Sequence, residues 1–260
     1  MAQDESAKTT AVVTGGLVGI GQAIACALSA NGVRVAIGAR RGDDPALREE
    51  ARKLMGPQTI VHPLDVRSEA SVLAFRDAVE AECGGIGILV NAAGICIHQT
   101  VSGHGLQDWN DSIATNLTGP FLMMKTFMPA MIGRGWGRIV NIASTAARTA
   151  MPDQAAYCAS KTGLLGLSRA AALEGAPHGV TCVTVSPTWV ETEMLRESAR
   201  IMAGQKGRDV ADEIAEIAQS NPQNRLVQPE EIAAVVAFLC SDRVPALTME
   251  DISINAGAHW

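Results

Sequence analysis

Short apolar runs alternate with longer segments of mixed polarity along nearly the whole chain. The short runs are rich in β-branched residues, which is typical of buried strands, while the longer segments have the periodicity of amphipathic helices. One such segment places Val72, Phe75 and Val79 on a single helical face. The expected strands are Thr10–Thr14, Val33–Ile37, Thr59–Pro63, Ile86–Asn91, Gly137–Ile142, Thr181–Ser186 and Asp251–Asn255. The expected helices are Gly19–Asn31, Asp44–Leu54, Glu69–Glu82, Asp108–Ile132, Asp153–Glu174 and Glu230–Cys240.

This alternation predicts βαβ units and hence an α/β fold, a doubly wound parallel sheet of the Rossmann type. The segment Glu191–Asn224 departs from the pattern, because it is charged, contains Gly204 and Gly207, and lacks strand signals. We interpret it as a helical excursion over the site. No linker, repeat or low-complexity tract interrupts the chain, so we expect one domain over 1–260, with a polar N-terminal tail at 1–8.

Composition narrows the class of protein. Apolar residues make up 47% of the 260 residues, enough for a sizeable core. The net charge of −6 and the scattered basic residues argue against nucleic-acid binding. The polar, acidic start is unlike a signal peptide, and the uncharged stretches are too short to span a membrane. The six cysteines form no C-x-x-C pair and no metal-ligand pattern, so we expect a cytoplasmic protein with reduced thiols and no metal.

A glycine-rich loop directly follows the first expected strand. Gly15, Gly19 and Gly21 have the spacing G-x-x-x-G-x-G, with Leu17 and Ile20 inside the loop. Glycine permits a tight turn and a close approach to a pyrophosphate, and the next helix directs free N–H groups at the phosphates. An ordinary glycine-rich turn is the alternative. The strand before and the helix after favour a dinucleotide site that includes all five residues.

The end of the second strand bears on the choice of cofactor. Folds of this kind that prefer NAD usually place a carboxylate there for the ribose 2′-hydroxyl. This chain has Arg40 and Arg41 instead. A guanidinium binds a phosphate with a planar fork of donors, so Arg40, assisted by Arg41, suits the 2′-phosphate of NADP. The alternative is that Asp43 and Asp44 neutralise both arginines; NADP is therefore preferred and NAD kept open.

The single tyrosine of the chain, Tyr157, lies four residues before Lys161. On a helix this spacing places the phenol and the ammonium one turn apart on the same face. A nearby positive charge favours the phenolate, so we expect the pKa of Tyr157 to fall toward neutrality and the phenol to act as an acid/base. Such a pair also arises by chance, and its weight comes from the motifs around it.

Together these motifs resemble the short-chain dehydrogenase/reductases. The resemblance covers about Thr10 to Gly257. It rests on the glycine loop, on Asn91-Ala92-Ala93-Gly94 after the fourth strand, on Asn116 and Ser144, and on Tyr157-x-x-x-Lys161. It implies an NAD(P)-dependent enzyme that interconverts a ketone and a secondary alcohol.

The resemblance also implies roles for individual residues. Tyr157 would exchange a proton with the substrate oxygen, and Ser144 would hydrogen-bond that oxygen. Lys161 would lower the pKa of Tyr157 and bind the nicotinamide ribose. Asn116 would hold a water that links Lys161 to solvent. The remaining cofactor contacts would come from Asp65, Val66, Asn91, Ala93, Gly94, Pro187 and Thr192.

The substrate pocket should be formed by the loops 95–105, 145–154 and 189–224, whose residues are mostly apolar or small. Arg148 and His98 are polar exceptions; a solvated arginine and a surface histidine are the favoured interpretations, with a substrate contact as the alternative. The chain is also similar to 3-hydroxybutyrate dehydrogenases, which bind their carboxylate through a glutamine, a histidine and a lysine. The matching positions here are Cys96, Ala146 and Gln154.

These positions favour a ketoreductase acting on a weakly charged ketone with NADP(H). An NAD-dependent dehydrogenase of a 3-hydroxy acid, a sugar or a polyol is the alternative, and a non-catalytic dinucleotide sensor is a remote one. The small-molecule substrate is the expected partner. The resemblance also suggests a homo-oligomer, a tetramer or a dimer.

Overall fold

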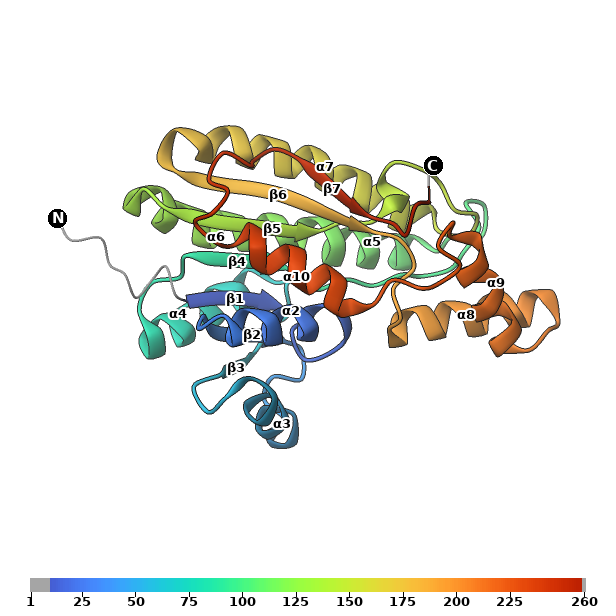
Figure 1. Ribbon diagram of the computed structural model, residues 1–260, viewed down its shortest axis with the longest axis horizontal. Coiled ribbons are helices and arrows are strands. Elements are labelled where there is room, and N and C mark those ends of the chain that lie inside the picture. The colour runs from blue at the N-terminus through green and yellow to red at the C-terminus, as the bar shows by residue number, and fades with distance from the viewer. Residues whose placement is uncertain (1–9, 259–260) are drawn as a thin grey trace.

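The computed structural model describes residues 10–258, so the predicted tail at 1–8 lies outside the described residues. Seven parallel strands form one sheet in the order β3-β2-β1-β4-β5-β6-β7 (Figure 1). The strands are β1 (Thr10–Thr14), β2 (Arg34–Ala39), β3 (Ile60–Pro63), β4 (Ile88–Asn91), β5 (Gly137–Ile142), β6 (Val180–Pro187) and β7 (Asp251–Ile254). The predicted doubly wound parallel sheet is confirmed. The order reverses between β1 and β4, and in such sheets ligands bind beyond the carboxyl ends of the strands at that point.

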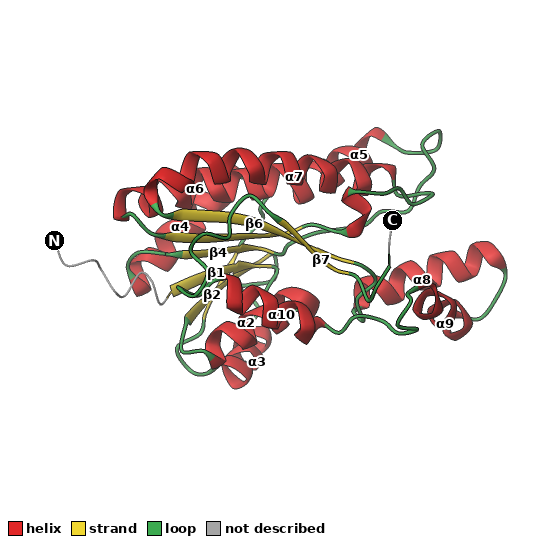
Figure 2. Ribbon diagram, turned by 45° about the horizontal axis from the view of Figure 1, so that its top comes forward, coloured by secondary structure: helices red, strands yellow, loops and turns green. Residues whose placement is uncertain are grey.

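Helices cover both faces of the sheet (Figure 2). Their bounds are α2 (Gly19–Ala30), α3 (Pro45–Met55), α4 (Glu69–Cys83), α5 (Leu106–Ile113), α6 (Gly119–Arg134), α7 (Ala155–Gly175), α8 (Glu193–Lys206), α9 (Val210–Ser220) and α10 (Pro229–Leu239). Three short turns complete them: the π-helical η1 (Ala114–Thr118) and the 3₁₀ turns η2 (Thr145–Ala147) and η3 (Ala176–His178). No helix of the described part is long and apolar enough to cross a membrane.

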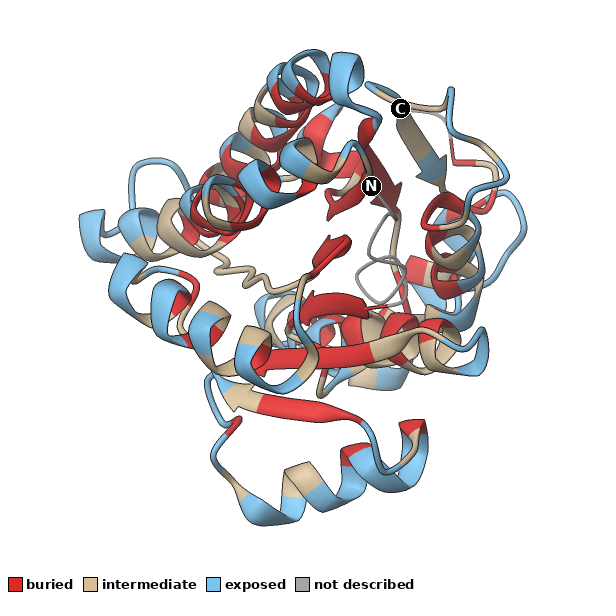
Figure 3. Cartoon of the chain, turned by 90° about the vertical axis from the view of Figure 1, so that its left-hand side faces the viewer, coloured by how far each residue is buried: buried red, intermediate tan, exposed pale blue. Residues whose placement is uncertain are grey.

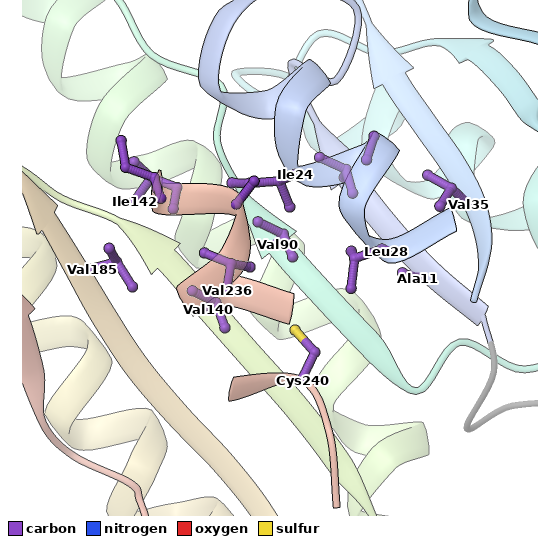
Figure 4. Close-up of a cluster of buried hydrophobic side chains, with 14 of the residues drawn as sticks. Ala11, Ile24, Leu28, Val35, Val90, Val140, Ile142, Val185, Val236 and Cys240 are labelled. Carbon is purple, nitrogen blue, oxygen red and sulfur yellow. The ribbon is translucent and has the colours of Figure 1, made fainter. Parts of the chain in front are cut away.

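Two hydrophobic cores lie on opposite faces of the sheet. Helices α2, α3 and α10 contribute to one, in which Ile24, Leu28 and Val236 pack over the strands (Figure 4). Helices α4, α6 and α7 contribute to the other. Successive residues of a strand point to opposite faces, so Val13 belongs to the first core and Val12 to the second. The central strands β1, β4, β5 and β6 are therefore buried on both sides, whereas the edge strand β7 is only partly buried (Figure 3).

The single helix predicted over Asp108–Ile132 is wrong. The chain forms α5, then the π-helical turn η1, then α6, which has Pro120 in its first turn and Pro129 inside it. Within η1, the Asn116 side chain bonds both backbone groups of Ile95. A π-helical turn inserts one residue into the helical repeat and often occurs at functional sites.

The predicted helical excursion is confirmed as two helices, α8 and α9. Gly207 ends α8 in the left-handed conformation with φ +64°, and Asp209 caps α9 by accepting from the N–H of Ala211. The other element bounds differ from the prediction by a few residues. Strand β4 begins at Ile88 rather than at Ile86, and strand β2 extends to Ala39, so that Arg40 follows it directly.

Candidate active site

Four predicted catalytic residues converge from three parts of the fold. Tyr157 and Lys161 lie one turn apart on α7, with the Lys161 Nζ 5.6 Å from the centroid of the Tyr157 ring. Ser144 follows β5 after one residue and hydrogen-bonds the Tyr157 phenol. Asn116 is buried in η1 and donates to Ser160 Oγ at 3.1 Å, between Tyr157 and Lys161 in sequence. The sheet thus brings together residues that are up to 45 positions apart, from Asn116 to Lys161.

Burial dominates the electrostatics of this cluster. It raises the pKa of Tyr157, and the nearby Cys96 also raises it, whereas the hydrogen bond from Ser144 lowers it. The prediction that Lys161 brings the pKa of Tyr157 toward neutrality is therefore wrong for the protein alone. Burial likewise lowers the pKa of Lys161, from 10.5 to about 8. Both shifts have the same cause, since a low-dielectric environment disfavours the charged form of either group.

Backbone and side-chain contacts hold the cluster in place. Lys161 Nζ donates to the carbonyl of Ile142 at 2.7 Å, which ties α7 to the end of β5. Asn116 Oδ1 accepts from Ile95 N, and Nδ2 donates to Ile95 O, both at 2.9 Å. Both Nδ2 hydrogens are thus engaged, so a water on this side chain would bind through Oδ1. The proton-relay role of Asn116 stays a prediction.

The cluster opens into a cleft of about 130 Å³. Among the predicted residues, Ile20, Gly94, Ser144, Tyr157, Lys161, Pro187 and Thr192 line it. Cys96, Ala146 and Gln154 line it too, as their positions predicted. Trp189 also lines the cleft, as do Met194, Leu195 and Ser198 of the excursion. Lys161 is the only charged residue that lines the cleft in the described part of the chain.

The glycine loop forms a tight cradle next to this cleft. Gly15 and Gly19 have φ values of +69° and +54°, which strain any residue with a side chain. A Cβ on Gly21 would collide with the carbonyl oxygen of Gly15. Helix α2 begins at Gly19, and Val18, the residue before it, does not cap its first turn with a side-chain hydrogen bond. Its N–H groups are therefore available to an anion, and the residues present fit a dinucleotide pyrophosphate.

The two arginines after β2 differ in their surroundings. Arg41 forms an ion pair with Asp44 at 2.7 Å, and Asp44 also caps α3. Arg40 is exposed and has no hydrogen bond or ion pair within residues 10–258. The pKa of Asp65 is lowered mainly by its hydrogen bond from Arg67, and the charge of Arg40 adds slightly to this effect. Asp44 therefore neutralises one guanidinium, and Arg40 keeps its donors for a ligand.

The other predicted cofactor residues lie around the carboxyl ends of β1, β3 and β4. Gly94 leaves a gap beside the catalytic cluster, since a Cβ there would lie 3.4 Å from Asn116 Oδ1 and 3.7 Å from Lys161 Nζ. Leu17 packs against the first core, and Ala93 against the second. Asp65 is held by Arg67 at 2.8 Å, and Val66 is buried.

The Asn91 side chain lies in the core rather than along the cleft. Its Nδ2 donates to Asn141 Oδ1 at 2.7 Å, and Asn141 in turn donates to Ser168 Oγ of α7 at 2.8 Å. This buried chain of polar groups links β4, β5 and the helix that carries Tyr157. Any contact of Asn91 with a cofactor would have to come from its backbone.

Nearly the whole chain is similar to a known family of enzymes. A family model described as enoyl-(acyl carrier protein) reductase matches residues 15–259. The D-threitol dehydrogenase of Mycolicibacterium smegmatis is 38% identical over 250 residues, covering 95% of this chain and 91% of that protein. The chain belongs to the short-chain dehydrogenase/reductases.

Two further short-chain dehydrogenase/reductases extend the comparison. The acetoacetyl-CoA reductase of Cupriavidus necator is 37% identical over 252 residues, covering 96% of this chain and 97% of that protein. A solved structure of an actinorhodin polyketide ketoreductase with NADPH has a TM-score of 0.91 at 34% identity, covering 96% of this chain and 97% of that one. The protein is therefore an oxidoreductase of the alcohol/ketone class in a family that uses NAD(P). The enzyme prediction is confirmed, and the sensor alternative is set aside.

Several residues around the site escaped the sequence analysis. Thr14 Oγ1 accepts from the N–H groups of both Ala92 and Ala93 at 3.1 Å, which fixes the loop after β4 against the end of β1. Ser160 Oγ donates to the carbonyl of Tyr157 at 2.7 Å while accepting from Asn116. A hydroxyl at each of these positions was the available signal, but such residues are common at strand ends and in helices.

His98 and Arg148, the two polar exceptions in the pocket loops, are not simply solvated side chains. His98 is half-buried, and its Nε2 lies 2.9 Å from Ser198 Oγ on α8, so the surface interpretation is wrong. Arg148 is partly exposed but ion-paired, with its Nε 2.7 Å from Asp251 Oδ2. Neither residue lines the cleft.

Proposed function

We propose that this short-chain dehydrogenase/reductase reduces an uncharged or weakly charged ketone with NADPH, and catalyses the reverse oxidation. The observation that carries this proposal is the lining of the cleft, where Lys161 is the only charged residue among the described residues. A substrate carboxylate would need cationic or strong donor groups there. Cys96 and Ala146 supply none, and Gln154 is neutral. A 3-hydroxy acid is therefore disfavoured.

The proposed chemistry assigns a task to three residues of the cluster. The nicotinamide, when bound, supplies the hydride to the carbonyl carbon or accepts it from the alcohol. Tyr157 donates its phenolic proton to the carbonyl oxygen, and Ser144 donates a hydrogen bond to that oxygen as negative charge develops. Lys161, protonated below pH 8, stabilises the phenolate that remains.

The cofactor assignment follows from the cradle and the free arginine. Gly15, Gly19 and Gly21, together with the uncapped start of α2, would hold the pyrophosphate. Arg40 would bind the 2′-phosphate, because it has no partner in the described chain while Arg41 is paired with Asp44. A neutral 2′-hydroxyl would leave this guanidinium without an acceptor, which favours NADPH over NADH.

Oxidation of a polyol is the second candidate. The relative at 38% identity is a D-threitol dehydrogenase. The cleft also contains neutral hydrogen-bonding side chains at Thr149, Gln154, Thr188 and Ser198, which could bind several hydroxyl groups. The homo-oligomer and the cytoplasmic location stay predictions.

The test is the change in nicotinamide absorbance with purified protein. NADPH and NADH are compared with β-ketoesters and cyclic ketones, with acetoacetate as the charged control and a four-carbon polyol with NADP⁺ in the reverse direction. We expect faster turnover with NADPH on an uncharged ketone. Turnover only with NADH, or only on acetoacetate, would overturn the proposal, whereas turnover confined to the polyol would favour the second candidate.

Substitutions of Arg40 and Arg41 form a matched pair of variants that tests the preference for NADPH. Arg40→Ala should raise the KM for NADPH about 10- to 100-fold, which corresponds to the loss of a charged hydrogen bond, with little change in the KM for NADH. Arg41→Ala should have a much smaller effect, since its guanidinium is already paired with Asp44. Equal effects of the two substitutions would contradict the assignment of Arg40.

A further inference from the structure

Asp251 is a buried carboxylate at the start of β7, with a side chain only 4% exposed. Its Oδ1 accepts hydrogen bonds from Thr184 Oγ1 at 2.8 Å and from Ser186 Oγ at 2.6 Å, both on β6. A carboxylate so far removed from water is costly unless it is paired and hydrogen-bonded. Asp251 therefore needs a cation as well as these hydroxyls.

Arg148 is that cation. Its Nε donates to Asp251 Oδ2 at 2.7 Å, and its Nη2 donates to the backbone carbonyl of Asp251 at 2.8 Å. The guanidinium thus binds both the side chain and the main chain of Asp251. It is the only ion-pair partner of Asp251 within residues 10–258.

Arg148 also ends the turn that orients Ser144. The turn η2 begins directly after Ser144, whose Oγ accepts from Ala146 N at 3.1 Å, and Arg148 N donates to Thr145 O at 2.9 Å. Thr162 of α7 donates to the carbonyl of Ala147 at 3.0 Å. The turn is therefore held from two sides, by α7 through Thr162 and by β7 through Arg148.

We propose that the Arg148–Asp251 pair is a positioning device for Ser144, which fixes the turn η2 to the last strand of the sheet. The pair touches neither substrate nor cofactor and acts only through the hydroxyl of Ser144. It rests on the proposed function, in which Ser144 bonds the reacting oxygen. A displacement of about 1 Å in such a group is enough to cost up to about 100-fold in rate.

Substitutions at both ends of the pair separate positioning from stability. Arg148→Ala leaves the Asp251 charge buried and unpaired, so it should lower both the melting temperature and kcat. The double variant Arg148→Ala, Asp251→Asn removes that charge, while the new amide oxygen can still accept from the hydroxyls of β6. The double variant should have a melting temperature close to that of the wild type. Its kcat should nevertheless stay about 10- to 100-fold below that of the wild type. The KM for NADPH should not change. Arg76→Ala, which breaks an exposed pair with Asp77 on α4, is the control.

A double-mutant cycle tests whether the Arg148–Asp251 pair acts through Ser144. It combines the double substitution at the pair with Ser144→Ala. We expect the double substitution to reduce kcat in the wild type but to have almost no further effect once Ser144 is alanine. If the double substitution lowers kcat by the same factor in Ser144→Ala as in the wild type, the positioning proposal is overturned, while the proposed function is unaffected. A full kcat in the double variant would overturn it as well. Normal turnover by Ser144→Ala alone would remove the role of Ser144 in the proposed function and this proposal with it.

Discussion

At the scale of single residues, burial favours the neutral forms of both Tyr157 and Lys161. Burial raises the pKa of Tyr157 and lowers that of Lys161 to about 8. A protonated phenol is the form needed to reduce a carbonyl. Lys161 remains charged below pH 8, and burial of this charge in a low-dielectric environment costs free energy. The carbonyl of Ile142 offsets part of that cost by accepting from Nζ.

This cost should be visible in the pH dependence of stability. Below pH 8, Lys161 is protonated in both the folded and the unfolded chain, and the fold carries the full penalty. Between pH 8 and 10.5 the unfolded chain retains a proton that the folded chain has lost, so raising the pH stabilises the fold. The free energy of unfolding of the wild type, relative to Lys161→Met, should therefore rise by ~3 kcal/mol across this window. Denaturant titrations of both proteins below pH 8 and near pH 10.5 measure it; a constant difference would contradict the shift.

At the scale of elements, the helices α8 and α9 form a separate unit over the cleft. They share a small hydrophobic cluster that includes Leu195, Ala199 and Ile217. Two backbone hydrogen bonds close the base of the unit, from Glu191 N to Val227 O and from Val227 N to Trp189 O. The contact between His98 and Ser198 is the only side-chain hydrogen bond that joins α8 to the chain outside 187–228, within the described residues. This arrangement is typical of a lid that moves on a narrow base.

The His98–Ser198 contact should therefore help to close the cleft over a substrate. His98→Ala should raise the KM of the substrate about 5-fold, as expected for the loss of one neutral hydrogen bond, with a smaller effect on kcat. Ser198→Ala should have a similar effect, and the two substitutions should not add. Arg200→Ala, which removes ion pairs with Glu193 and Glu197 within α8, is the control. An unchanged KM in His98→Ala would show that this contact does not hold the lid.

At the scale of the whole molecule, the parallel sheet brings distant motifs to one edge. The sequence was sufficient to predict this, because β-branched runs, the spacing of Gly15, Gly19 and Gly21, and the pair Tyr157 and Lys161 are local signals. The π-helical turn was not predictable, since it depends on a bond from Asn116 to Ile95, 21 residues away. The pairs His98–Ser198 and Arg148–Asp251 join residues 100 and 103 positions apart. The direction of the Tyr157 shift was missed because it depends on burial, whereas the sequence displays only the neighbouring charge.

The apolar surface of the molecule is relevant to its assembly. Large apolar side chains are exposed on three neighbouring helices, at Leu106 and Trp109 of α5, Phe121 of α6 and Leu173 of α7. Contiguous apolar patches often mark protein–protein interfaces, and the homo-oligomer stays a prediction.

The role of the Tyr157 phenol is tested by comparing the wild type with Tyr157→Phe in the NADPH-dependent reduction of an uncharged ketone. The wild type should oxidise NADPH, while Tyr157→Phe should turn over at least about 100-fold more slowly. NADPH binding, followed by the fluorescence of the nicotinamide, should be nearly the same in both proteins, because the cradle and Arg40 are untouched. A Tyr157→Phe variant that keeps the wild-type rate would contradict the role of the phenol as the proton donor.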